Sequence, residues 1–190
     1  MNYTVAASFS RAAMLIVGLS AVSLENTVNT PTKIEQSTSV AKPQPADLFD
    51  FWVGDWDLTW TTAKGVKLSG KNHIVKILGN VIEENFEASG PASPPPLKGK
   101  SVSILSAAGN VWKQTWVDNQ GGYLTFVAQT DGDKRIFATD PVIRNGVAAY
   151  QRMVFHDIAK DSFTWDWEGT RDGGKAWNNL WKIQYKRRVK

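Results

Sequence analysis

The chain has 190 residues, of which 42% are hydrophobic, 21% charged and 11% aromatic, a composition typical of globular rather than disordered proteins. It has no cysteine, which excludes disulfides, thiolate metal sites and cysteine catalysis. Its net charge is +4, from 22 Lys and Arg against 18 Asp and Glu. His73 and His156 are too few for a metal site made of several imidazoles. We therefore expect one compact domain without a metal.

The excess of positive charge is confined to the C-terminal end. Lys186, Arg187, Arg188 and Lys190 all lie within the last five residues. A nucleic-acid-binding face would need basic residues grouped across the fold, so we expect no nucleic-acid partner. The basic end is interpreted as a solvated, frayed terminus, with contact to a membrane surface or nucleic acid as the alternative.

Residues 1–23 have the pattern of a secretory signal peptide. Arg11 supplies the positive charge, residues 12–22 supply the apolar stretch, and residues 21–23 are small enough for cleavage. The alternative is an anchoring or buried helix, but the stretch is short for a membrane span and has no basic stop signal after it. We expect a periplasmic or secreted protein with no membrane span once the signal is removed.

The folded domain is expected at residues 47–190. Residues 24–46 are rich in Thr, Ser, Asn, Gln and Pro and lack apolar periodicity, which predicts a linker. Beyond it, apolar and polar residues alternate, as Trp56, Leu58 and Trp60 do with the residues between them. A period of two is typical of strands with one buried face.

This alternation continues to the end of the chain, with Gly, Asn and Asp at most of the joints. It predicts strands near residues 55–62, 70–78, 80–88, 98–106, 110–118, 122–130, 133–139, 147–157, 161–168 and 178–187. Pro91 and the prolines at 94–96 predict a stiff loop that cannot join a sheet. Residues 47–53 are expected to form a single helical turn.

About ten consecutive antiparallel strands leave two main architectures, an up-and-down β-barrel and a two-sheet sandwich. We favour the barrel. Eight or more strands closed on themselves leave room inside for side chains or for one small ligand, as in lipocalins.

Nine tryptophans in a chain of this size are the least usual feature of the composition. Trp112 and Trp116 are four residues apart on one face of a strand, and Trp165 and Trp167 are two apart. Large aromatic side chains commonly fill the core or plug the end of a barrel. The alternative is an aromatic-lined cavity for a flat or apolar ligand.

Two polar residues fall on apolar strand faces. Glu84 shares the face of Ile82 and Phe86, and Gln114 lies between two tryptophans on their shared face. Burial raises the pKa of a carboxyl group, which then can bind a cationic or hydroxyl group or act as an acid or base. The alternative is a structural ion pair with an interior Arg or Lys.

Tyr150 and Arg152 share one face of the strand at 147–157 and could hold an anionic head group, since guanidinium binds carboxylate through two hydrogen bonds. Met153 and Phe155 favour the opposite face as the internal one, which would place Arg152 in solvent. Both orientations remain open at this point.

The remaining motifs give little chemistry. No Gly-rich phosphate loop follows a strand, Ser103 and Ser106 lack a nucleophile elbow, and residues 131–133 form a turn rather than a calcium loop. A lone histidine is usually structural. We expect no cofactor, with haem bound through His156 as the one alternative.

Five segments carry motifs that are shared with other proteins: residues 49–60, 81–86, 100–103, 112–124 and 161–168. In these segments the chain resembles a bacterial family of lipocalin-like domains. The resemblance covers about residues 47–187 and implies a calycin-type barrel, distantly similar to lipocalins, fatty-acid-binding proteins and nitrobindins. It carries no agreed activity. The opening Phe-Trp-x-Gly-x-Trp is similar to the lipocalin Gly-x-Trp strand, which implies that Trp56 plugs the closed end of the barrel.

The specific motifs of fatty-acid-binding proteins and nitrobindins match this sequence less well. A fatty-acid-binding protein has Arg-x-Tyr on its last strand, whereas this chain has Tyr150-Gln151-Arg152 earlier and in reverse order. The nitrobindin analogy needs a suitably placed histidine, for which His156 is the candidate.

The leading hypothesis is an exported barrel, monomeric or a small homo-oligomer, that binds a small apolar or amphipathic molecule inside. Its expected ligand-binding residues are Trp56, Glu84, Phe86, Trp112, Gln114, Trp116, Tyr123, Tyr150, Arg152, Trp165 and Trp167. The alternative is an isomerase, cyclase or hydrolase that uses Glu84 as general acid or base in the same cavity. A third possibility is a partner-binding module that uses exposed aromatic residues and the proline-rich loop.

Overall fold

The structure, a computed structural model, describes residues 44–89, 95–108 and 110–189. The expected signal peptide, all but the last three residues of the expected linker, and Pro91 and Pro94 lie outside these residues. Within the described part of the chain, no helix has the length and apolarity needed to cross a membrane.

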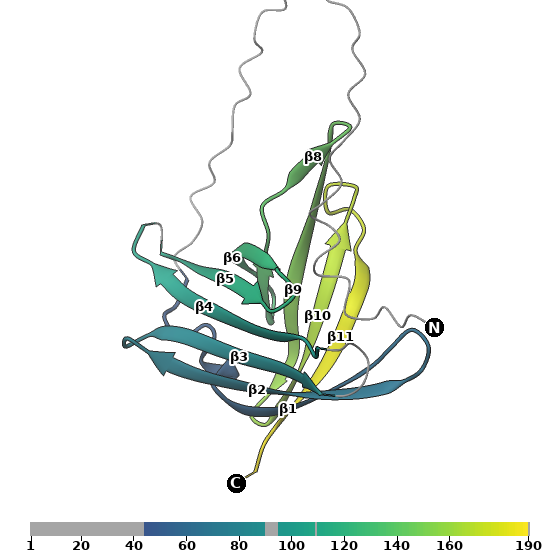
Figure 1. Cartoon of the computed structure of the whole chain (residues 1–190). Helices are drawn as coiled ribbons and strands as arrows, with labels where there is room; N and C mark the ends of the chain where they lie inside the picture. The colour runs from purple at the N-terminus through teal and green to yellow at the C-terminus, as the bar shows by residue number, and fades with distance from the viewer. Residues whose placement is uncertain (1–43, 90–94, 109, 190) are drawn as a thin grey trace, which may run out of the picture.

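The described residues form one short helix and eleven strands (Figure 1). The 3-10 helix η1 covers Asp50–Trp52. The strands are β1 (Gly54–Thr61), β2 (Lys67–Ile77), β3 (Val81–Ser89), β4 (Lys98–Ser106), β5 (Val111–Asp118), β6 (Tyr123–Asp131), β7 (Lys134–Ala138), β8 (Val142–Arg144), β9 (Val147–Ala159), β10 (Ser162–Thr170) and β11 (Asn178–Arg187).

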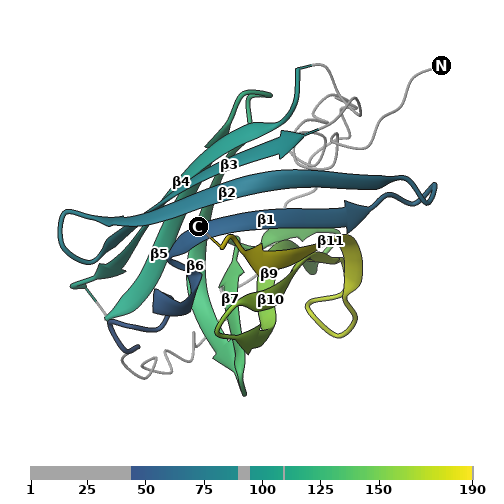
Figure 2. The same cartoon turned by 90° about the horizontal axis from the view of Figure 1, so that it is seen from below.

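Ten of the strands close into a single antiparallel barrel. Strands β1 to β7 pair with their neighbours in chain order, β7 then pairs with β9, β9 with β10, β10 with β11, and β11 with β1. Figure 2 shows these strands curving round a common interior. The prediction of an all-β, up-and-down barrel of about ten strands, of the lipocalin or calycin type, is confirmed.

Strand β8 is the element that the sequence did not predict. It pairs with β9 alone and lengthens the β8–β9 hairpin beyond the rest of the barrel (Figure 1). Its three residues are too few to show a period of two. The other strands begin and end within three residues of their predicted bounds, and the helical turn expected at 47–53 is η1.

The inner face of the barrel is packed with aromatic rings. On β1, Trp56, Leu58 and Trp60 are buried while the residues between them are exposed, as the alternation predicted. Phe49, just before η1, stacks on Phe137 with ring centroids 4.4 Å apart and meets Trp112 edge-on at 5.6 Å. Such pairs add to the stabilisation that burial of apolar area already provides.

One end of the barrel is closed by η1 and by the two chain segments that meet there. Trp56 is fully buried, and its Nε1 donates a hydrogen bond to the backbone oxygen of Trp52 at 2.8 Å. The guanidinium of Arg187 lies 4.1 Å from the centroid of the Trp56 ring and donates to the backbone oxygens of Val53 (2.9 Å) and Phe51 (3.2 Å). Arg187 thus links β11 to η1 and β1.

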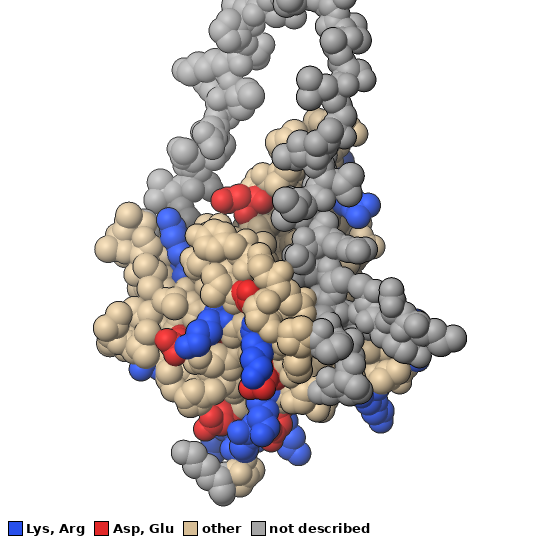
Figure 3. Space-filling view, viewed as in Figure 1, with Lys and Arg blue, Asp and Glu red and all other residues tan. Residues whose placement is uncertain are grey.

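The interpretation of the basic end as frayed is therefore wrong for two of its four cations. Arg187 contacts Trp56, and Arg188 forms an ion pair with Asp57 at 2.7 Å. Side chains of both charges gather at this end in the space-filling view (Figure 3). The contacts join residues about 130 positions apart in the chain, so no local sequence pattern predicted them.

Replacing Arg187 tests this closure. Arg187→Ala removes the cation–π contact and the hydrogen bonds to the backbone oxygens of Val53, Phe51 and Lys160, so we expect the free energy of unfolding to fall by about 2–3 kcal/mol. Lys186→Ala, on the exposed side of the same strand, is the matched control and should change it by less than about 0.5 kcal/mol. Urea denaturation measures both, and equal effects would contradict the assigned role of Arg187.

Candidate functional site

A cluster of polar side chains lies inside the barrel on strands far apart in the chain. Its members are Asn72 on β2, Glu84 on β3, Ser101 on β4 and Tyr185 on β11, all buried. Each occupies an inward position of its strand, so strand alternation carries it to the interior. A polar group there must find a partner, because an unsatisfied one costs free energy.

Glu84 is the centre of this cluster. Asn72 donates from Nδ2 to Glu84 Oε1 at 2.7 Å and to the hydroxyl of Tyr185 at 3.2 Å. The hydroxyl of Ser101 donates to Glu84 Oε2 at 2.6 Å. Each oxygen of the carboxyl group therefore accepts one hydrogen bond from an uncharged donor.

Burial dominates the acidity of this group. It raises the pKa of Glu84 from an ordinary 4.5 to about 7, against the hydrogen bonds from Ser101 and Asn72, which lower it. Burial and the nearby charge of Glu84 raise the pKa of Tyr185 well above its usual value. The hydrogen-bond partners of Glu84 among the described residues are neutral, so the alternative of an interior ion pair with Arg or Lys is wrong.

Next to Glu84 the interior holds a small cavity. Its volume is about 30 Å³, enough for a group the size of one water molecule. The lining residues are mostly aromatic or aliphatic: Glu84, Phe86, Leu97, Trp116, Phe126, Met153, Trp165, Trp181, Ile183 and Tyr185. Trp52, Trp56, Trp112 and Trp167 are almost fully buried, as the core-filling interpretation of the tryptophans predicted.

Two tryptophan rings, those of Trp181 and Trp116, form part of the cavity wall. Trp181 packs edge-on against Trp165 at 5.8 Å and against Phe86 at 6.0 Å. Trp116 approaches the backbone of β4 so closely that a Cβ at Gly99 would collide with its ring. Its Nε1 donates to Asp118 at 3.0 Å. Gly99 is thus required at this position because the tryptophan lies directly against the strand.

Several of the expected ligand residues meet at this cavity and others do not. Glu84, Phe86, Trp116 and Trp165 line it. Trp167 lies beside Trp165, with the two rings nearly parallel at 6.3 Å. Three others are buried elsewhere in the interior: Gln114 bonded to Ser103 at 3.0 Å, Trp112 bonded to the oxygen of Pro45 at 3.0 Å, and Trp56 at the closed end.

The expected ligand set is wrong at three positions, because the structure places Tyr123, Tyr150 and Arg152 outside the barrel. Tyr123 is 68% exposed. Arg152 forms an ion pair with Glu168 at 2.7 Å and lies 3.6 Å from the centroid of Trp177, whose ring meets Tyr150 edge-on. Of the two orientations that the sequence left open for β9, the structure has the one with Met153 and Phe155 inside.

Four residues of the site were not predicted from the sequence: Asn72, Tyr185, Trp181 and Leu97. Tyr185 lies two residues after the buried Ile183 and so on the same face of β11, a signal that was available in the sequence. Asn72 lies two residues before the buried Ile74 on β2 and could have been found in the same way. Leu97 is the one lining residue of this cavity that lies outside the strands, so no periodicity marks it.

His156, the candidate haem ligand, lies on the outer face of β9. Its Nδ1 is 2.9 Å from a carboxylate oxygen of Asp157, and its Nε2 is 3.0 Å from one of Asp166. Both ring nitrogens therefore face carboxylates. No group of three His, Asp or Glu side chains among the described residues is arranged to hold a metal ion.

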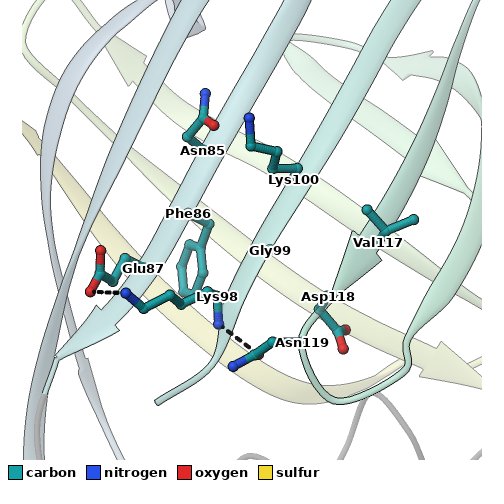
Figure 4. A pocket seen from close by; sticks show the side chains of 9 residues that line it. All are labelled: Asn85, Phe86, Glu87, Lys98, Gly99, Lys100, Val117, Asp118 and Asn119. Carbon is teal, nitrogen blue, oxygen red and sulfur yellow. Dashed lines mark hydrogen bonds and ion pairs between the residues drawn. The ribbon is translucent and has the colours of Figure 1, made fainter. Parts of the chain in front are cut away.

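Two wider hollows lie at the surface. One, of about 360 Å³, runs along β3, β4 and β5 and is bordered by the exposed ion pair of Lys98 with Glu87 (Figure 4). The other, of about 750 Å³, lies beside η1, β7 and β9 and includes His156 and Arg135. Neither contains a buried, uncharged polar cluster comparable with the one around Glu84.

Comparison of the chain with protein-family models and with curated proteins finds no match.

The raised pKa of Glu84 makes the stability of the fold depend on pH. Below pH 4.5 the carboxyl group is protonated in both the folded and the unfolded state. Between 4.5 and 7 the unfolded chain releases the proton while the folded protein keeps it, so the free energy of unfolding falls as pH rises, by about 3 kcal/mol in all. Above pH 7 this contribution is constant.

Urea denaturation from pH 4 to 8 measures this loss. We expect the stability of Glu84→Gln relative to the wild type to rise across that range, because glutamine cannot ionise. Glu87→Gln, on the outer face of the same strand, controls for general charge effects. Parallel pH curves for the wild type and Glu84→Gln would show that Glu84 is not buried as described.

Proposed function

We propose that this protein is an exported, lipocalin-like barrel that binds one small apolar or amphipathic molecule beside Glu84. The signal-like residues 1–23 support export, and the resemblance at the opening strand supports the family. Phe86, Trp116 and Trp165 offer the ligand an aromatic surface, and Glu84 offers it one polar anchor.

The buried carboxyl group of Glu84 carries this proposal. Glu84 is 5% exposed and has no cationic partner among its hydrogen-bonding residues. Such a group lowers the stability of the fold, whereas an apolar side chain of similar size would raise it. Strongly perturbed acids in cavities are concentrated at functional sites, and this one borders the cavity inside the barrel.

The size of the cavity limits how a ligand is held. A volume of about 30 Å³ accepts one small group, so the rest of any larger ligand needs a side chain to move.

Native mass spectrometry of the protein purified from its own host tests this function. We expect a small molecule to be retained by the wild type and by the control Glu87→Gln, and to be lost or reduced at least about tenfold in Glu84→Gln and Trp116→Ala, since these remove the anchor and part of the wall. An empty wild-type barrel, or a ligand unaffected by both variants, would contradict the proposal.

A second candidate function is catalysis by the same acid. The pKa of Glu84, about 7, is close to the value at which a group can both give and take a proton at neutral pH. In that case the cavity releases a product rather than retaining a ligand. A turnover rate with a pH inflection that Glu84→Gln abolishes would favour the enzyme over the binding protein.

A further inference from the structure

We infer that the cavity beside Glu84 is a binding site for one water molecule, which accepts a hydrogen bond from the Tyr185 hydroxyl and donates one to the Glu84 carboxylate. This inference goes beyond the proposed function, because it concerns the protein before any ligand is bound. It follows from three features of the cavity: its size, the two members of the polar cluster on its wall, and the hydrogen bonds that these two groups can still make.

The cavity has the size of a single water molecule. Its volume is about 30 Å³. A buried cavity of this size holds a water molecule where at least two polar groups can bind it, whereas a cavity with a purely apolar wall stays dry. The polar groups on the wall therefore decide whether water binds.

Two members of the polar cluster line the cavity, Glu84 and Tyr185. They are 5% and 3% exposed, so bulk solvent does not satisfy them. Asn72 Nδ2 donates to Glu84 Oε1 at 2.7 Å and to the Tyr185 hydroxyl at 3.2 Å. Two oxygens that share one donor lie close enough together for a single water molecule to contact both.

The Tyr185 hydroxyl has a proton to donate. Among the described residues its hydrogen-bond partner is Asn72, from which it accepts. A phenolic hydroxyl both accepts and donates, so its own proton is available to a molecule in the cavity. A buried donor without an acceptor is unfavourable, and a water molecule supplies the acceptor.

The Glu84 carboxylate has the complementary capacity. Its two oxygens accept one hydrogen bond each, from Asn72 and Ser101, and a carboxylate oxygen can accept more than one. No Lys, Arg or His lines the cavity, so a further neutral donor is the partner that the ionised group gains there. The water molecule accepts the proton of Tyr185 and donates one of its own to Glu84.

Water suits this pair of groups better than a small ion does. An ammonium ion only donates, which leaves the proton of Tyr185 without an acceptor. A halide ion only accepts and is repelled by ionised Glu84. A water molecule does both and carries no charge. A ligand group that replaces this water meets the same donor and the same acceptor.

High-resolution crystal structures of the ligand-free protein at pH 8, where Glu84 is mostly ionised, test the inference. We expect one ordered water oxygen at about 2.6–3.2 Å from both the Glu84 carboxylate and the Tyr185 hydroxyl. Tyr185→Phe removes one of the two partners, so the water should be lost or should move by more than about 1 Å. The control Tyr123→Phe removes a hydroxyl from an exposed side chain and should leave it in place.

Three results would overturn the inference. These are a wild-type crystal without ordered water in the cavity, a water molecule that keeps its position in Tyr185→Phe, and xenon bound there in a crystal under xenon pressure, since xenon enters dry apolar cavities. Circular dichroism verifies that each variant is folded. If Tyr185→Phe is not, the wild-type crystals with and without xenon decide.

Discussion

Closure of the sheet is the constraint on which the rest of this structure depends. Because β9 pairs with both β7 and β10, every second residue of ten strands points into one enclosed space and must fill it. Many of these positions hold tryptophan or phenylalanine, and the cavity beside Glu84 has a volume of about 30 Å³. Among such apolar side chains, the buried acid Glu84 contributes a titratable group that borders this cavity.

The sequence predicts this fold well where alternation is clear, and less well where both faces of a strand are covered. β1, β3 and β5 alternate between buried and more exposed positions, and their inner faces were predicted. On β9, residues 153–155 are all buried, because Val154 is covered on the outer side as well as Met153 and Phe155 on the inner. The alternation then does not show which residues of β9 face inward, and the orientation of Arg152 could not be decided from the sequence.

The sequence predicts Glu84 and three of the aromatic lining residues, Phe86, Trp116 and Trp165, but not the polar partners of Glu84. Glu84 follows from its place between Ile82 and Phe86, but its partners depend on strand register: Asn72 lies 12 residues away, Ser101 17, and the Asn72–Tyr185 bond spans 113. The size of the cavity depends on how the tryptophan rings pack, which no sequence pattern encodes. The same holds for Arg187, whose contact with Trp56 turns an apparent basic tail into the closure of the barrel.

The central claim is that Glu84 is a buried acid whose hydrogen-bond partners are uncharged. Carbon-13 NMR of the carboxyl groups, assigned through Glu84→Gln, measures its titration directly. We expect a midpoint near pH 7, because burial disfavours the ionised form. A midpoint near the ordinary 4.5 would contradict this claim.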